Sequence, residues 1–238
     1  MKVPEYAWSR THRPFTLLLV FHGLLAALTL HFFDGTGDAG DSVQHYLFAK
    51  WAVRHPELFF DHWAKPVFVL LACPFAQFGF VGIKIFNVLV SLLTVQLTVR
   101  IAQALGLRNA VLAGILLLFS PLVFILTFSG LTEPLFALFL CLGMYGVVKG
   151  RSMPAAVVLS FLPFVRSEGL ILLGVFGLYF LLKRKWKAIP LLFIGHLVYS
   201  VAGAFVHHDL LWVCTKVPYA RLNMTYGQGR PFGFLEGM

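Results

Sequence analysis

Long apolar runs, separated by short polar or basic turns, set the pattern of the chain. A helix that crosses about 30 Å of hydrocarbon needs about 20 mostly apolar residues. Runs close to this length, or moderately shorter, occupy residues 15–33, 81–99, 110–128, 131–148, 153–165, 170–182 and 189–206. The pattern therefore predicts an all-α, polytopic membrane protein with about seven transmembrane helices.

One further apolar run, residues 66–80, does not fit a crossing. At about 1.5 Å per residue a helix over this run would span roughly 22 Å, and Pro74 interrupts it. A crossing here would also place the basic cluster 183–187 outside, against the preference of basic loops for the cytoplasmic side. We therefore expect residues 34–80 to form a first extracytoplasmic loop with juxtamembrane and re-entrant segments, and the N-terminus to be cytoplasmic.

The composition agrees with a membrane protein and limits the classes of partner that we expect. Of the 238 residues, 59% are apolar and 12% charged, against about 45–50% and about 25% in soluble domains. The 19 Lys and Arg outnumber the 10 Asp and Glu, which gives a net charge of +9. The basic residues stand in short clusters between apolar runs, where they orient the helices and meet anionic membrane lipid. Nucleic acid is not an expected partner.

Acidic residues fall on one side of this predicted topology. All of the 10 except Glu5 lie in or beside the outer loops. Two explanations remain open: the only long loops lie outside, or the outer membrane face carries an active site.

The first outer loop combines glycines with three aspartates, Asp34, Asp38 and Asp41. Asp41 precedes a helix-compatible stretch, 43–54, whose aromatic residues suit the membrane surface. Asp41 is then either an N-cap that accepts backbone N–H bonds or a carboxylate poised as a general base. The two roles are compatible.

The same aspartates leave a divalent cation as an alternative, because Mg²⁺, Mn²⁺ and Ca²⁺ take oxygen ligands. Three further side chains stand close enough in sequence to add ligands, or are simply solvated: His45, Asp61 and His62.

Two polar groups lie where apolar runs turn. Glu133 falls in the first turn of the run 131–148, where the helix dipole favours an anion without any chemistry. The Arg166–Ser167–Glu168 turn separates two runs too short to reach the outer surface comfortably. An arginine and a glutamate at that depth indicate either a functional site or a local ion pair that holds the hairpin together.

The order and spacing of these groups resemble the GT-C glycosyltransferases, in particular the bacterial branch related to protein O-mannosyltransferases and lipid A aminoarabinose transferases. The resemblance covers about residues 16–229. It is carried by Gly40-Asp41, His45-Tyr46, Phe60-Asp61-His62-Trp63-Ala64-Lys65-Pro66, Ser129-Gly130-Leu131-Thr132-Glu133-Pro134 and Arg166-Ser167-Glu168-Gly169. Many members carry a second acidic residue directly beside the catalytic aspartate, where this chain has Ser42.

The resemblance implies an inverting transfer of a sugar from a polyprenyl-phosphate donor to a lipid, glycan or protein acceptor. It implies that Asp41 is the catalytic base, with Asp38 as the other candidate, and that no cofactor is required. The groups expected to bind substrate are Lys65, Arg166, Glu168, Glu133, His45, Asp61 and His62.

The resemblance also implies a bacterial inner-membrane protein whose active site faces the periplasm or the exterior. Members are commonly longer than this chain, which predicts a single module, 1–238, truncated at its C-terminus. The alternatives are a polytopic transporter or lipid flippase, which needs ionisable groups near the membrane midplane, and a non-catalytic scaffold.

Overall fold

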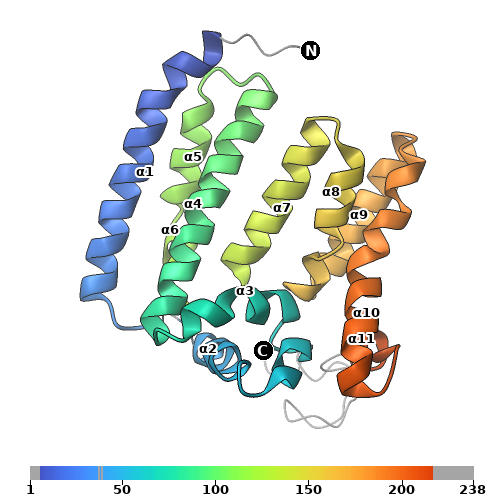
Figure 1. The fold of residues 1–238 in the computed structure, drawn as a ribbon. Helices are drawn as coiled ribbons and strands as arrows, with labels where there is room; N and C mark the ends of the chain where they lie inside the picture. Colours follow the sequence, from blue (N-terminus) through green and yellow to red (C-terminus); the bar gives the residue numbers. More distant parts are fainter. Residues whose placement is uncertain (1–5, 37, 39, 217–238) are drawn as a thin grey trace, which may run out of the picture.

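A computed structural model describes residues 6–36, 38 and 40–216 of the chain. Within these residues every regular element is a helix (Figure 1), which confirms the all-α prediction. The α-helices are α1 (Tyr6–Phe32), α2 (Asp41–Trp51), α3 (Pro66–Ala76), α4 (Phe80–Ala104), α5 (Ala110–Leu118), α6 (Pro121–Thr127), α7 (Glu133–Val148), α8 (Ser152–Leu159), α9 (Gly169–Leu182), α10 (Ile194–His207) and α11 (Trp212–Thr215). Short 3-10 turns are η1 (Pro56–Phe60), η2 (Leu162–Phe164), η3 (Trp186–Ala188) and η4 (Pro190–Phe193).

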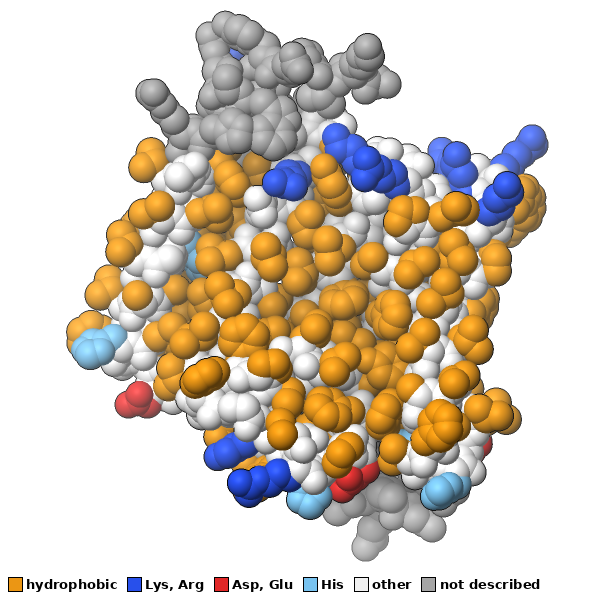
Figure 2. Space-filling model, in the orientation of Figure 1, with side chains coloured by type: hydrophobic (Ala, Val, Ile, Leu, Met, Phe, Trp, Pro, Cys, Tyr) orange, Lys and Arg blue, Asp and Glu red, His pale blue; other side chains and the backbone are white. Residues whose placement is uncertain are grey.

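The long helices stand side by side and alternate in direction, while α2 and α3 lie across one end (Figure 1). The apolar character of these helices drives the packing: α4 lies at the centre, between α5 and α7. A contiguous core joins α3, α4, α7 and α10 through buried side chains such as Phe68, Ile83 and Leu135. Large apolar side chains also cover the outside between the two ends of the molecule (Figure 2), as expected for a surface that faces lipid.

Three helical stretches are long and apolar enough to cross a membrane: Phe15–Phe32, Phe80–Ala104 and Trp186–His207. The predicted span 110–128 is broken into α5 and α6, which meet at 66° and would make a fourth span together. Pro121 at the start of α6 explains the break, because proline cannot continue a helix from the preceding turn. The predicted spans 131–148, 153–165 and 170–182 form shorter apolar helices.

The run 66–80 forms α3, a helix of 11 residues that lies across the end of the bundle (Figure 1). A helix of that length covers about 16 Å. Its side chains Phe68, Val69 and Ala72 are fully buried. The segment therefore packs against its own protein, chiefly α2 and α4.

Charge divides the molecule into two ends. The acidic end, where α2 and α3 lie, holds every Asp and Glu of the described residues: Asp34, Asp38, Asp41, Glu57, Asp61, Glu133, Glu168 and Asp209. The opposite, basic end holds the turns that carry Arg100, Arg108, Lys149, Arg151, Lys183, Arg184, Lys185 and Lys187 (Figure 2). Glu5 and Glu236 lie outside the described residues.

Candidate functional site

Segments that are far apart in sequence meet at the acidic end. The backbone N–H of Gly130 donates a 3.0 Å hydrogen bond to Ser42 Oγ in the first turn of α2. A Cβ added at Gly130 would lie 2.8 Å from the Ser42 carbonyl oxygen, so glycine permits this close approach. Lys65, directly before α3, donates a 2.8 Å hydrogen bond from Nζ to Ser167 Oγ. Four of the predicted motif segments are thus joined in two pairs.

Arg166 is the charged centre of an ionic cluster at this end. Its guanidinium contacts Glu133 Oε1 at 2.5 Å and Glu168 Oε1 at 2.7 Å, and it donates a longer bond of 3.4 Å to Thr132 Oγ1. The predicted Arg166–Glu168 pair is therefore present and extends to Glu133, the first residue of α7. The hydrogen bond from Arg166 holds the pKa of Glu168 below its usual range. The network joins the 129–133 turn to the 166–168 turn.

Lys65 stands beside this network in a strained backbone conformation. Its φ of 68° lies in the left-handed region, which is unusual for a residue with a side chain. Such strain, of order 1–3 kcal/mol, persists where the surrounding structure fixes the residue and gathers at functional sites. Burial and the nearby charge of Arg166 lower the pKa of Lys65, although Glu168 and Asp61 act in the opposite direction.

His45 is a buried, neutral side chain that packs against two aromatic residues. Its ring stacks on Trp63 with 4.9 Å between centroids, and Phe68 lies 5.4 Å away. Burial lowers the pKa of His45 to about 4, so the ring is uncharged at neutral pH. The charges of Asp41, Lys65 and Arg166 all act on this ring. These three candidate residues therefore lie within electrostatic range of one buried side chain.

The N-cap residue of α2 is Gly40, and the side chain that bonds the backbone at this end is that of Asp38, not that of Asp41. Asp38 Oδ2 accepts hydrogen bonds from the backbone N–H groups of Gly40 at 3.2 Å and Ser42 at 2.9 Å. Burial raises the pKa of Asp38, but the hydrogen bonds from Thr36, Ser42 and Gly40 outweigh it and lower the net value. The interpretation of Asp41 as an N-cap was wrong, because α2 begins at Asp41 itself. Within the described residues the exposed Asp41 carboxylate makes no hydrogen bond or ion pair.

Asp61 and His62 lie in the segment that leads into α3, and their side chains bond in different directions. Asp61 Oδ1 accepts a 2.8 Å bond from the backbone N–H of Ala64, which fixes the turn before Lys65. His62 turns away, toward the carbonyl oxygen of Val213 at 3.2 Å, and burial lowers the pKa of His62. Across residues 6–36, 38 and 40–216, no three His, Cys, Asp or Glu side chains gather closely enough to hold a metal ion.

Two supporting residues on α4 were missed by the sequence analysis. The fully buried Asn87 donates from Nδ2 to the carbonyl oxygens of Ser129 at 2.8 Å and Leu131 at 3.1 Å. Lys84 donates from Nζ to the carbonyl oxygen of Phe33 at 2.7 Å. The signal was available, because polar residues within an apolar run are expensive and seldom lack a role. Asn87 holds the turn that carries Glu133, and Lys84 holds the chain leaving α1.

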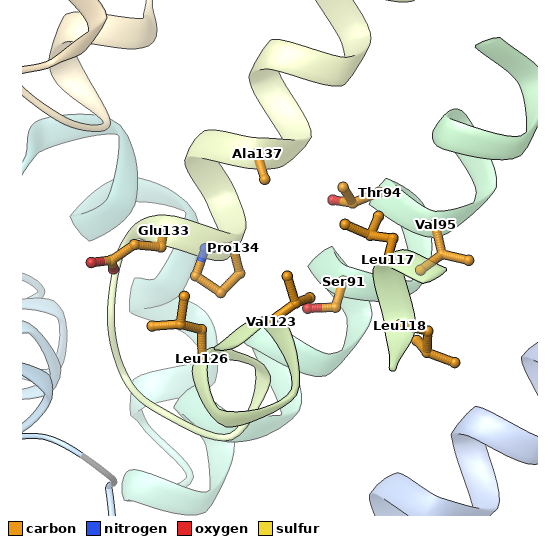
Figure 3. Close-up of a pocket in the computed structure, with 10 residues that line it drawn as sticks. All are labelled: Ser91, Thr94, Val95, Leu117, Leu118, Val123, Leu126, Glu133, Pro134 and Ala137. Carbon is orange, nitrogen blue, oxygen red and sulfur yellow. The ribbon is translucent and has the colours of Figure 1, made fainter. Parts of the chain in front are cut away.

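An apolar groove runs between α4, α5, α6 and α7 and ends at Glu133 and Pro134 (Figure 3). The Glu133 carboxylate points away from the groove, toward the side where Arg166 lies. The hydroxyls of Ser91 and Thr94 are bonded to Thr127 Oγ1 and to the Val90 carbonyl oxygen, so the groove offers an apolar surface. Its volume is about 160 Å³, similar to the roughly 150 Å³ of a cavity that holds benzene.

The chain was compared with protein-family models, with curated proteins and with solved structures. None of these comparisons gives a match. The functional assignment therefore rests on the residues and their arrangement.

Proposed function

We propose that the chain is a GT-C-type membrane glycosyltransferase that moves a sugar from a polyprenyl-phosphate donor to an acceptor at the acidic end. The observation that carries this proposal is the gathering of Asp41, Lys65, Glu133 and Arg166 at one end of an apolar helical bundle. These residues come from four segments that the family resemblance picked out in the same order along the sequence.

Arg166 and Lys65 would bind the donor phosphate. A guanidinium has five N–H donors, and the contacts to Glu133, Glu168 and Thr132 leave donors for a phosphate oxygen. The two glutamates fix the orientation of the planar fork, which favours bidentate binding over a diffuse charge. Lys65 adds a second positive charge next to the Arg166 turn.

The groove beside Glu133 supports a lipid-linked donor. Its volume suits about one isoprene unit of five carbons, by comparison with a benzene-sized cavity. It lies between α4, α7 and the broken pair α5–α6, next to Glu133 of the ionic cluster (Figure 3). On this proposal the first isoprene unit of the polyprenyl chain enters the groove, and the remainder runs along the lipid-facing surface.

The transfer needs one base and one stabilised leaving group. Asp41 takes the proton from an acceptor hydroxyl, whose oxygen attacks the anomeric carbon from the face opposite the phosphate. The bond between that carbon and the phosphate oxygen breaks, and polyprenyl phosphate leaves with its charge facing Arg166 and Lys65. The anomeric configuration inverts. General base catalysis of this kind contributes about 10²–10⁴ in rate.

The proposed placement puts the basic end in the cytoplasm and the acidic end outside, with the predicted seven passes between them. The excess of Lys and Arg at the basic end agrees with the positive-inside rule. The ion-paired groups lie at the acidic end and not midway along the bundle, which favours an enzyme over a transporter or flippase.

The purified chain in lipid vesicles, supplied with a radiolabelled polyprenyl-phosphate sugar and a membrane lipid extract, tests the proposal. We expect label to move from the acid-labile donor to an acid-stable product, and no transfer when a nucleotide sugar replaces the donor. Movement of intact donor between leaflets without bond cleavage would identify a flippase and contradict the proposal.

A further inference from the structure

Three helices end at the basic end in the same way. In α4, α7 and α9 the residue after the cap has a positive φ, and the next N–H donates to a carbonyl five residues earlier. This is the Schellman motif, in which the left-handed position is usually glycine. The bonds are Leu107 N to Ala102 O at 3.0 Å, Arg151 N to Gly146 O at 2.8 Å and Lys185 N to Phe180 O at 2.8 Å.

Arg184 is the exception among these three motifs. The left-handed position is Gly106 after α4 and Gly150 after α7, but Arg184 with φ of 54° after α9. A side chain is less favourable than glycine in this conformation. Positive charge near the end of α9 does not need this position, because Lys183 and Lys185 flank it. Neither the backbone conformation nor the helix-end charge therefore explains an arginine at this position.

A pocket lies beside Arg184. It occupies about 420 Å³ between the turn that joins α7 to α8 and the turn that joins α9 to η3. Its lining includes Arg184, Lys185 and Lys187 together with the side chains of Ser152, Met153 and Trp186. Within the described part of the chain every acidic residue lies at the other end, so these cations have no carboxylate partner. We call this cavity the basic pocket.

We propose that the basic pocket binds the phosphodiester headgroup of an anionic phospholipid. Three cationic side chains around one cavity complement a phosphate, and such pockets between membrane helices bind anionic headgroups. Trp186 and Met153 are 60% and 50% exposed next to these cations. An exposed tryptophan beside lysine and arginine is typical of the membrane interface, where acyl chains lie within reach. The inference is independent of the proposed glycosyl transfer.

Native mass spectrometry of the full chain in detergent, titrated with phosphatidylglycerol or phosphatidylcholine, tests the proposal. We expect tighter binding of phosphatidylglycerol. Arg184→Gly removes the charge and relieves the left-handed strain, so the unfolding temperature should stay the same or rise while phosphatidylglycerol binds about fivefold more weakly. Lys187→Gln, which leaves the Schellman turn unchanged, should weaken binding to a similar extent.

The matched control is Arg108→Gly, which removes the same charge at the basic end but outside the pocket. Equal losses of binding in Arg108→Gly and Arg184→Gly would mean that the charge acts diffusely and would overturn the site. Displacement of phosphatidylglycerol by inorganic phosphate at equal concentration would assign the pocket to free phosphate and overturn the lipid assignment. A fall in unfolding temperature in Arg184→Gly would overturn the argument from backbone conformation.

Discussion

Lys65 and Ser167 are 102 positions apart in sequence, yet Lys65 Nζ donates a 2.8 Å hydrogen bond to Ser167 Oγ. The bond joins the start of α3 to the turn before α9. The neighbour of Ser167, Arg166, is held by Glu133 and Glu168 from two sides. Lys65 is thus bonded to the residue next to Arg166, and on our proposal both cations face the donor phosphate.

Arg166→Lys should impair sugar transfer while the charge is kept. Lysine is a point charge and cannot contact Glu133, Glu168 and a phosphate oxygen with a planar fork. Hydrogen bonds to charged groups are worth about 1.5–3 kcal/mol, so we expect kcat/KM for the donor to fall roughly 10- to 100-fold. Initial rates at several donor concentrations measure this. Lys216→Arg, an exchange at the same end outside the cluster, is the control, and equal rates in both variants would remove Arg166 from the site.

Asp38→Ala should lower stability through the loss of the cap of α2. The Asp38 carboxylate satisfies two backbone N–H groups, and removal of a helix cap costs about 0.5–2 kcal/mol. Thermal unfolding in detergent measures the change. Asp41→Ala, which removes an exposed carboxylate three positions away, should cost about 0.5 kcal/mol or less. A larger loss in Asp41→Ala than in Asp38→Ala would reverse the assignment of the cap.

We predict that the folded chain loses stability in mild acid because of His45. The folded chain holds a neutral His45 with a pKa of about 4, whereas the unfolded chain takes up a proton near pH 6.5. The unfolded state therefore binds more protons between these values, and stability falls as the pH drops from about 6.5 toward 4. The full contribution is about 3 kcal/mol.

Unfolding temperatures of wild type and His45→Gln between pH 7.5 and 5 measure this contribution. His45→Gln should flatten the pH dependence of the unfolding temperature. The same pH slope in wild type and His45→Gln would show that His45 is not the group that titrates.

Gly130→Ala should separate α2 from the 129–133 turn. The added Cβ would lie 2.8 Å from the backbone oxygen of Ser42, which cannot move as a flexible side chain does. Overpacking of this kind costs about 1–3 kcal/mol. Gly174→Ala in α9 is the control, because no atom lies within 4 Å of its added Cβ. Denaturation midpoints should fall in the first variant and not in the second; equal midpoints would contradict the close approach at Gly130.

The apolar pattern predicted the helices, because a lipid-facing surface and a packed core both require the same residue types. The apolar pattern did not predict the break between α5 and α6 at residue 120, because the run 110–128 is apolar on both sides of it. The charged members of the candidate cluster could be predicted individually. Their partners Thr132 and Ser167 could not, because those contacts depend on tertiary packing between distant segments. Asn87 stands out in the sequence as a polar residue within an apolar run, but its bonds to Ser129 and Leu131 do not.

The cap of α2 shows how a small shift changes an assignment. A helix expected from residue 43 makes Asp41 the natural cap, whereas the observed start at Asp41 makes Gly40 the N-cap and leaves the backbone N–H bonds to Asp38. The sequence offers two aspartates, and in the observed backbone, where Gly40 has a φ of 123°, Asp38 is the one that bonds the N–H groups of Gly40 and Ser42. The correction leaves the Asp41 carboxylate without a hydrogen bond or ion pair among the described residues.

The central claim is that Asp41 is the base of a lipid-dependent sugar transfer at the acidic end. Its most direct test is the single-turnover rate of sugar transfer from a radiolabelled polyprenyl-phosphate donor by wild type, Asp41→Asn and Asp38→Asn in matched vesicles. We predict that Asp41→Asn lowers this rate about 10²- to 10⁴-fold with unchanged unfolding temperature and donor binding, while Asp38→Asn, which keeps an oxygen for the cap, retains most of the rate. Wild-type rates in Asp41→Asn, or no transfer by the wild-type chain, would contradict the account.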